Sequence, residues 1–393
     1  MSESIVIVGA KRTPIGGMNG QFVNLTSPQL AAVAIKAAVE QAGVKPEDVT
    51  EALIGCVLPA ALGQAPARQA VLGAGLLKST ACTTVNKVCG SGMKTTMMAY
   101  DALLAGTVSG AVVAGGMESM SNAPHLLPKA RQGYRYGHVK ALDHMAFDGL
   151  ENAYDGKSMG IFADATAAKY GITREEQDNF SLESVKRAQG AVASGAFKAE
   201  IAGVTTKGKA GDVVLDTDET PGQCRPDKIP TLKPAFNKDG TVTAATSSSI
   251  SDGAAALVLM RESHAKATGI APIARIVGHA SNAHEPEWFT TAPVGAIQKL
   301  QTKLGWTPET VDLYEINEAF AIVTMAAMKD CNLPHSKVNV NGGACALGHP
   351  IGATGARLIV TLLHALKARG GKRGIASLCI GGGEATAIAV EMC

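Results

Sequence analysis

Two stretches that lie far apart in the chain repeat the same order of sequence features. Residues 85–116 contain VNKVCGSG, a helical stretch rich in alanine and methionine, and then VSGAVVAGG. Residues 339–383 contain NGGACALGHPIGATG, a second helical stretch, and then GIASLCIGGG. Each stretch combines a glycine-rich turn, a helix and an apolar strand that ends in glycines. The shared order indicates an ancient duplication, and we expect two similar halves whose loops meet at one site.

The strand-like segments favour an α/β fold. Apolar runs without polar alternation lie at 51–59, 110–116 and 252–260. Such runs are typical of strands that are buried on both faces. Helical patterns alternate with them, for example at 27–43 and at 91–106. This alternation predicts an α/β architecture for most of the chain.

The domain organisation follows from where this pattern is regular. The chain has 393 residues, which is enough for two or three domains. Residues 1–120 carry the first α/β half, and residues 250–270 complete it. Residues 121–249 contain a polar, loop-rich tract, so we interpret them as an inserted loop domain. Residues 271–393 form the second half.

The composition excludes several classes of function. The net charge of +2 at pH 7 argues against binding to nucleic acid or to an anionic membrane surface. No apolar run reaches the ~20 residues of a membrane span, and the N-terminal sequence MSESIVIVGAKRTP lacks the pattern of a secretion signal. The eight cysteines include no CxxC pair. We therefore expect reduced thiols, no metal site and a cytoplasmic location.

Cys89 is the first candidate for chemistry. A buried structural cysteine is the ordinary interpretation of such a residue. Here, however, the cysteine comes directly before a predicted helix, whose N-terminal dipole favours a thiolate. The small residues Gly90, Ser91 and Gly92 leave room for a substrate and expose backbone N–H groups that can stabilise an oxyanion. The context therefore favours a nucleophile.

Three further residues lie at comparable turns. His349 is either a histidine of a surface turn or a base that takes a proton from a thiol. Cys379 is either a core cysteine or, at the corresponding turn of the second half, a reactive partner of Cys89. Asn317 is either a helix N-cap or an amide donor at the carboxyl end of a strand, where open α/β sheets bind ligands.

Five motifs, in this order, resemble those of the thiolases, the acetyl-CoA acetyltransferases and 3-ketoacyl-CoA thiolases. They are NxxCGSG, GGMESMS, NEAFA, GHPIGATGAR and CIGGG. The resemblance covers the whole chain, and the GHPIG and IGATGAR forms are similar to the biosynthetic, short-chain branch. It implies a thiolase fold, in which two βαβαβαββ halves form a five-layered core and a loop domain binds CoA.

The resemblance also implies roles for the candidate residues. Cys89 matches the nucleophile that becomes acylated, and His349 matches the base that activates it. With Asn317, His349 also matches the oxyanion hole that holds the thioester oxygen through a water. Cys379 matches the acid/base that moves the α-proton of the second acyl-CoA. The N–H groups of Cys89 and Gly381 match a second oxyanion hole.

The residues that would contact the CoA thioester are also implied by the resemblance. Ser248 matches a contact to the pantetheine arm, and Met159 and Phe320 match walls of the acyl pocket. The other matching positions are Ser158, Phe236, Ala319 and Leu150.

The chain departs from the family pattern at four positions. Thr246 and Ser249 lie in TAATSSS, where relatives usually have asparagine and glycine. Ser158 replaces a histidine, and Gly222 replaces an arginine near the CoA nucleotide. Arg225 lies close to this position, but the sequence does not establish it as a substitute. These changes put CoA affinity and acyl preference in doubt.

The resemblance predicts an enzyme that reversibly condenses two acetyl-CoA to acetoacetyl-CoA and CoA, with no cofactor, as a homotetramer of paired dimers. The alternative is a 3-ketoacyl-CoA thiolase of broader or longer chain specificity in fatty acid β-oxidation. A 3-ketoacyl synthase would have histidine in place of Asn317 and would not need Cys379. A Cys-His-Asn hydrolase would leave the other motifs unexplained. A non-catalytic CoA-binding protein would not need four reactive side chains.

Overall fold

The structure is a computed structural model that describes residues 3–208 and 211–393. Residues 1–2, in the predicted first half, and residues 209–210, in the predicted inserted domain, lie outside the described residues.

Within these residues, ten strands form the central sheet. They are β1 (Ile5–Arg12), β2 (Gly16–Gly17), β3 (Val49–Gly55), β4 (Ala81–Val85), β5 (Ala111–Ser119), β10 (Ser251–Arg261), β11 (Ala274–Ala283), β12 (Leu313–Ile316), β13 (Arg373–Ile380) and β14 (Glu384–Met392). The order is β12-β13-β14-β11-β1-β10-β5-β3-β4, and β2 pairs with β10. The strands of the two halves join where β1 pairs antiparallel with β11 over three residue pairs.

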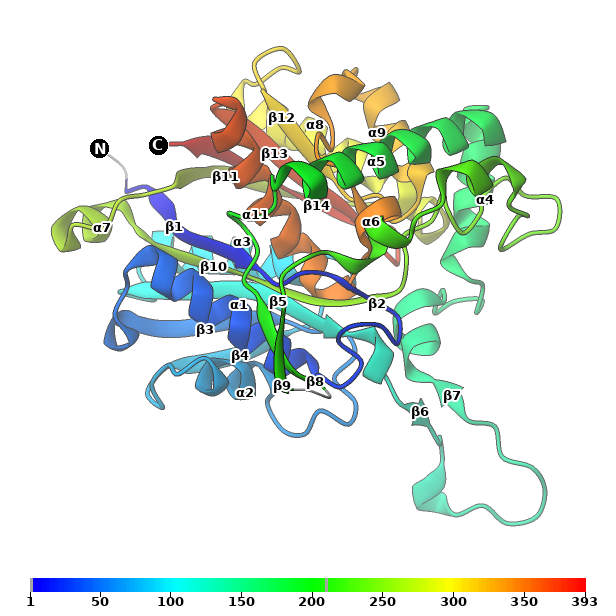
Figure 1. The fold of residues 1–393 in the computed structure, drawn as a ribbon, viewed down its shortest axis with the longest axis horizontal. Coiled ribbons are helices and arrows are strands. Elements are labelled where there is room, and N and C mark those ends of the chain that lie inside the picture. The colour runs from blue at the N-terminus through cyan, green and yellow to red at the C-terminus, as the bar shows by residue number, and fades with distance from the viewer. Residues whose placement is uncertain (1–2, 209–210) are drawn as a thin grey trace.

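Helices cover both faces of this sheet and also fill the space between its two halves. They are α1 (Ser27–Ala42), α2 (Pro66–Gly73), α3 (Ser91–Ala105), α4 (Met159–Tyr170), α5 (Arg174–Ser194), α6 (Glu219–Gln223), α7 (Glu262–Thr268), α8 (Ala292–Leu304), α9 (Ala321–Asp330), α10 (Ala344–Leu347) and α11 (Ile351–Arg369). α3 and α11 pack against each other and against strands of both halves, α1 and α2 pack on the first half, and α8 packs on the second. The result is a five-layered α/β molecule (Figure 1). The predicted fold is confirmed.

The second half differs from the predicted element order at one place. Where the first half has β4, the second half has only an isolated bridge between Tyr314 and Val338. The next residue, Asn339, has φ of +47°, which ends the extended chain. Its side chain accepts a hydrogen bond from the Ile316 N–H and donates one to the Ile316 carbonyl, both at 2.8 Å. These side-chain bonds take the place of the expected strand ladder.

The segment between β5 and β10 is less regular than the rest of the described chain. It contains α4, α5, α6 and two short hairpins, β6 (His125–Leu126) with β7 (Leu142–Asp143) and β8 (Val204–Gly208) with β9 (Gly211–Leu215). A buried cation anchors this segment to β1. The Arg12 guanidinium contacts Glu200 at 2.6 Å and Asp218 at 2.7 and 2.9 Å. Because the charge of Arg12 is fully buried, loss of either carboxylate would be costly.

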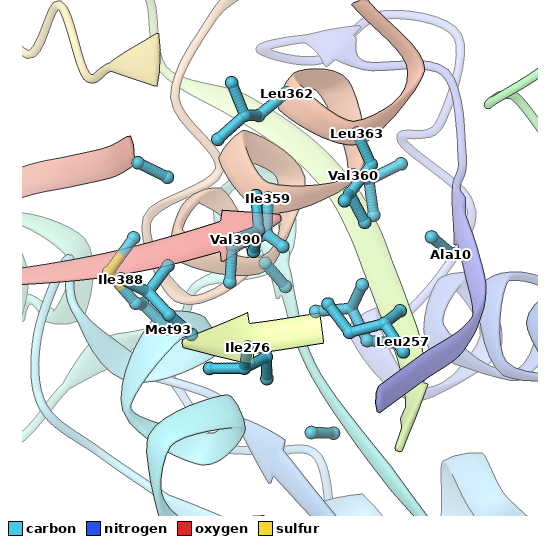
Figure 2. Packing of buried hydrophobic residues seen from close by; sticks show 14 of the residues in the cluster. Ala10, Met93, Leu257, Ile276, Ile359, Val360, Leu362, Leu363, Ile388 and Val390 are labelled. Atoms are coloured by element: carbon cyan, nitrogen blue, oxygen red, sulfur yellow. The ribbon is translucent and has the colours of Figure 1, made fainter. Parts of the chain in front are cut away.

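α11 is the most buried helix of the central layer. Its length and hydropathy alone would allow it to cross a membrane, but 83% of that apolar window is buried inside the molecule. Figure 2 shows why: Ile359 and Leu362 lie among side chains of the surrounding strands, including Ile388 and Val390, with Met93 of α3 nearby. The apolar sequence of this helix therefore reflects its position between the two halves of the central sheet.

α3 and α11 approach so closely that neither helix tolerates a side chain at the contact. A Cβ atom added to Gly92 would lie 2.9 Å from the Ala356 nitrogen and 3.0 Å from the Gly352 oxygen. A Cβ atom added to Gly355 would lie 2.7 Å from Met93 Cβ and closer still to the Met93 nitrogen. Because these neighbours are mostly backbone atoms, they cannot move without a shift of a whole helix.

We expect Gly355→Ala to destabilise the protein by about 1–3 kcal/mol, the usual range for overpacking in a close-packed core. Gly190→Ala is the matched control, because Gly190 is also helical but a Cβ atom added there would have nothing within 4 Å. The control should be neutral or slightly stabilising, since alanine favours a helix over glycine by ~1 kcal/mol. Thermal unfolding of both variants is the measurement. Equal melting temperatures would show that the helices separate at little cost.

Candidate active site

The turns that precede α3 and α11 and the turn that follows β13 meet at one cavity of about 390 Å³. Eleven of the twelve predicted site residues line it: Cys89, Leu150, Ser158, Met159, Phe236, Ser248, Ala319, Phe320, His349, Cys379 and Gly381. Asn317 lies directly behind the lining, bonded to His349. The two halves and the inserted segment all contribute to the cavity, so it exists only in the assembled fold.

Cys89 lies in a tight turn just before α3. Val88 has φ of +47°, and Ser91 Oγ accepts a hydrogen bond from the Lys87 N–H at 2.9 Å while donating one to the Val88 carbonyl at 2.7 Å. The N–H groups of Gly381 and of Cys89 itself act on the thiol and favour its thiolate. Burial outweighs them and raises the pKa of Cys89 to about 11. Desolvation therefore opposes the thiolate that the sequence predicts the helix terminus to favour.

His349 is held in a form that can accept the missing proton. Its Nδ1 lies 2.6 Å from Thr354 Oγ1, which donates its own hydrogen to the Pro350 carbonyl at 2.9 Å. Because that hydroxyl hydrogen is already used, Nδ1 must be the donor, and Nε2 keeps its lone pair. Burial, assisted by the cationic Arg357, lowers the pKa of His349 to about 3. The ring is therefore neutral and available as a base at neutral pH.

Asn317 does not cap a helix, which corrects one of the two interpretations offered by the sequence. α9 begins four residues later, at Ala321, with Phe320 in the capping position. The Asn317 amide nitrogen instead lies 3.4 Å from His349 Nε2, and its Oδ1 is buried without a hydrogen-bond partner among the described residues. The amide is therefore placed beside the working nitrogen of the histidine.

Cys379 is fully buried and is the penultimate residue of β13. Burial raises the pKa of its thiol well above the usual value, and the neighbouring Cys89 adds to the rise. Cys379 and Cys89 thus face one cavity from opposite halves, and both are neutral in the resting protein. A neutral thiol is ready to donate a proton and must lose one before it can act as a base.

Glu118 links several backbone segments that lie next to the catalytic residues. Its carboxylate accepts hydrogen bonds from the N–H groups of Val57 at 3.0 Å, Leu58 at 3.1 Å and Gly352 at 2.9 Å. Burial raises the pKa of Glu118 to about 7, and the three donors oppose that rise. The group joins the end of β5 to the first turn of α11, next to His349. The motif GGMESMS contains this residue, but its position in the motif alone assigned it no role.

Aromatic and sulfur-containing side chains form one wall of the cavity. Phe320 packs edge-on against Phe236 and Phe289, with ring centroids 5.8 and 6.4 Å apart. Met159 and Leu150 lie on the same lining. Met120, Ile351 and Phe289 also line the cavity and were not predicted. Met120 and Ile351 fall within recognised motifs, whereas Phe289 lies in a short 3-10 segment with no sequence signal.

The departures from the family pattern lie in different places. Ser158 and Ser249 line the cavity, so they can affect substrate contacts directly. Thr246 is buried, and its Oγ1 accepts a hydrogen bond from the Thr243 N–H at 2.8 Å, which shapes the neighbouring loop. Gly222 and Arg225 lie on the exposed segment around α6 and do not line the cavity. Nothing in the structure gives Arg225 the role of the missing arginine.

We expect His349→Ala to slow the alkylation of Cys89 by iodoacetamide at least ~10-fold at pH 7–8, as for a lost general base. The pKa of Cys89 is about 11, so the thiolate is scarce below that pH and the reaction depends on a base. At higher pH the rates of variant and parent should converge. Mass spectrometry of the Cys89 peptide measures the rate. His364→Ala is the control, because His364 lies in α11, the helix that follows His349, but outside this cavity. Equal rates at pH 7 would leave His349 only an oxyanion role.

Comparisons with known proteins agree with this geometry. Residues 5–263 match the family described as thiolase, N-terminal domain, and residues 270–392 match thiolase, C-terminal domain. An acetyl-CoA acetyltransferase of Chromobacterium violaceum is 50% identical over 98% of this chain and 99% of its own length. A probable acetyl-CoA acetyltransferase of Dictyostelium discoideum is 49% identical over 99% of this chain and 94% of its own.

A solved structure is similar over the same extent. The Acat5 thiolase of Ascaris suum, crystallised in complex with coenzyme A, superimposes with a TM-score of 0.94 at 40% identity and covers 99% of this chain and 100% of its own. Family match, sequence identity and backbone superposition therefore agree over nearly the whole length. The chain belongs to the thiolase family.

Proposed function

We propose that this chain is an acetyl-CoA acetyltransferase, which reversibly condenses two molecules of acetyl-CoA to acetoacetyl-CoA and CoA. The observation that carries the proposal is that one cavity contains two thiols, the partly buried Cys89 and the fully buried Cys379, together with the neutral base His349. Relatives at 49–50% identity that bear this name support the choice of substrate. CoA thioesters serve as substrates, and no cofactor is required.

In the first step Cys89 becomes acetylated. His349 Nε2 takes the thiol proton, the sulfur attacks the carbonyl carbon of acetyl-CoA, and the carbon–sulfur bond to CoA breaks. The proton then passes from His349 to the departing CoA sulfur. The N–H groups of Cys89 and Gly381 act on the Cys89 sulfur, so they lie near the thioester that would form there. Preorganised donors of this kind contribute about 3–4 kcal/mol each to related acyl transfers.

In the second step a carbon–carbon bond forms or breaks. In thiolysis, Cys89 attacks the 3-keto carbon of acetoacetyl-CoA, and the neutral thiol of Cys379 protonates the carbon that leaves as the enolate of acetyl-CoA. In condensation, Cys379 must first be a thiolate and then take the α-proton. Because burial favours the neutral form of Cys379, the resting protonation state suits thiolysis directly.

One observation favours the alternative, a 3-ketoacyl-CoA thiolase of broader or longer chain specificity. Ser158 lines the cavity beside Met159, and a serine leaves more space than the histidine that relatives often have there. The bulky side chains of Phe320, Met159 and Leu150 still close the pocket, so we favour short acyl groups.

We also propose that the chain forms a homotetramer, a dimer of dimers. β4 is an edge strand with one side unpaired in the described chain, and such edges invite a partner strand. The β6–β7 arm projects from the body of the molecule (Figure 1) and exposes Leu127 and Tyr136. Exposed apolar side chains on a projecting arm are typical of contact surfaces. The mass in solution, measured by light scattering, tests this proposal.

We expect kcat/KM in the thiolysis direction to be at least ~10-fold higher for acetoacetyl-CoA than for 3-ketohexadecanoyl-CoA. A hydrophobic pocket discriminates by about 1–3 kcal/mol for each misfitted methylene, so a long chain that meets the aromatic wall loses transition-state binding. A series of 3-ketoacyl-CoA lengths is the measurement. Values that rise with chain length beyond six carbons would favour the alternative function.

We expect Cys379→Ser to separate the two half-reactions. The variant should still acetylate Cys89 and exchange acetyl groups between CoA molecules, because those steps need only Cys89 and His349. Thiolysis and condensation should fall by about 10²–10⁴-fold, as for a lost general acid/base, since a serine hydroxyl is far less acidic than a thiol. The ratio of exchange to thiolysis in one preparation is the readout. If both activities fall together, or neither falls, Cys379 does not move the α-proton.

A further inference from the structure

An ion pair links the two catalytic turns across the boundary between the halves. Lys87 lies two residues before Cys89, and Glu384 directly follows the glycine turn that contains Gly381. The Lys87 ammonium contacts the Glu384 carboxylate, with 24% and 39% of the respective side chains exposed. Although the two residues are 297 positions apart in sequence, each lies two or three residues from one of the backbone N–H groups that act on the Cys89 thiol.

Each end of this ion pair is held rigidly by its own turn. The Lys87 carbonyl accepts a hydrogen bond from the Gly90 N–H at 3.0 Å, and the Lys87 N–H donates to Ser91 Oγ at 2.9 Å. Lys87 therefore cannot move without displacing Cys89. On the other side, Glu384 is the strand partner of Ile380, and the two residues close the turn 381–383. A displacement of the Glu384 backbone would therefore also displace Gly381.

Apart from the Gly381 N–H that acts on the Cys89 thiol, the other contacts between the two turns are small and apolar. A Cβ atom on Gly90 would collide with the Ile380 side chain, so these two residues touch directly. A Cβ atom on Gly381 would be 3.8 Å from Val88 Cγ1. Such contacts prevent the turns from approaching too closely, but they supply little force that holds the turns together. The ion pair is the one charged contact that the structure gives, within the described residues, between Lys87 or its turn and the turn 381–384.

We propose that Lys87 and Glu384 are positioning residues that clamp the two oxyanion donors, the N–H groups of Cys89 and Gly381, at one fixed separation. The inference rests on the proposed thiolase chemistry at Cys89. Neither residue contacts the reacting atoms, and a half-exposed ion pair contributes only ~0–1 kcal/mol to stability. Its effect is instead expected in the geometry of the donors, because catalytic groups lose efficiency when they are displaced by about 0.5–1 Å.

The test uses Lys87→Gln, Glu384→Gln and the charge-reversed double variant Lys87→Glu/Glu384→Lys in the full-length enzyme. We expect each single variant to lower kcat for acetoacetyl-CoA thiolysis about 5–10-fold with KM changed less than twofold; complete loss of one oxyanion donor costs about 10²–10³-fold. The double variant should recover at least half of the lost kcat. Parent kcat should fall with added salt, which screens a partly exposed pair, whereas the kcat of the single variants should not.

A second readout follows the cysteine itself. The Gly381 N–H favours the thiolate of Cys89, so a loosened turn should shift the pH profile of Cys89 alkylation to higher pH in both single variants. A role confined to stability would leave this profile unchanged. Glu391→Gln is the matched control, because Glu391 forms a similar ion pair with Arg373, at 3.2 Å and with side chains 22% and 39% exposed, at the far end of the same hairpin. The Glu391→Gln variant should have the same kcat and the same pH profile of Cys89 alkylation as the parent.

Three results would each overturn the proposal that Lys87 and Glu384 position the two N–H groups. They are single variants that keep kcat within twofold of the parent, a double variant no better than the single ones, and a loss of kcat that accompanies a fall in melting temperature or in solution mass. An inactive parent would instead refute the proposed function, so the two failures are distinguishable.

Discussion

The close contact between α3 and α11 determines where the chemistry takes place. The helices pack with Gly92 and Gly355 at the contact because backbone meets backbone there. Cys89 precedes the first helix and His349 precedes the second, so the contact brings both to the same end of the central layer. The same contact aligns the N-termini of two helices, whose partial positive charges face the cavity together. A wider helix separation would leave each residue at a separate turn without a partner.

Burial has a second consequence for the reacting groups. It raises the pKa of both thiols and lowers the pKa of His349, so the resting site is neutral in all three side chains. A neutral site accepts a CoA thioester without burying an unpaired charge. The cost is that each proton must move to a neighbouring group during the reaction. The pair of Thr354 and His349 is suited to this, because the threonine keeps Nδ1 protonated and leaves Nε2 free to exchange a proton.

The inserted segment supplies the parts of the site that decide between substrates. Met159, Phe236 and Ser248 all come from it and line the cavity with residues of both halves. The Arg12, Glu200 and Asp218 side chains that attach it to β1 do not line the cavity. The machinery for acyl transfer and the walls that select the acyl group are therefore held by different contacts. Substitutions such as Ser158 for histidine can change the selection without disturbing Cys89 or His349.

The sequence alone determined the α/β architecture, the repeated order of elements and the nature of the reactive residues. Apolar strands without alternation and glycine-rich turns before helices are local signals, and they identify Cys89, His349 and Cys379 because these residues lie at the turns. The wall residue Phe289 and the Thr354 hydroxyl had no such signal, because their roles depend on partners that only folding brings near. The irregular strand at Val338 was also unpredictable, since the side chain of Asn339 competes with the ladder only when Ile316 is adjacent.

Protonation and mutual placement were decided by the tertiary structure. The sequence suggested a thiolate at Cys89 from its helix terminus, but the folded chain buries that thiol, and desolvation outweighs the nearby N–H donors. By sequence, Asn317 could be a helix cap or an amide donor at a ligand site. Its position 3.4 Å from His349 Nε2 favours the amide donor. Local sequence specifies which side chains are available at each turn. Their environment and their neighbours depend on contacts between residues hundreds of positions apart, which exist only after the two halves have packed around α3 and α11.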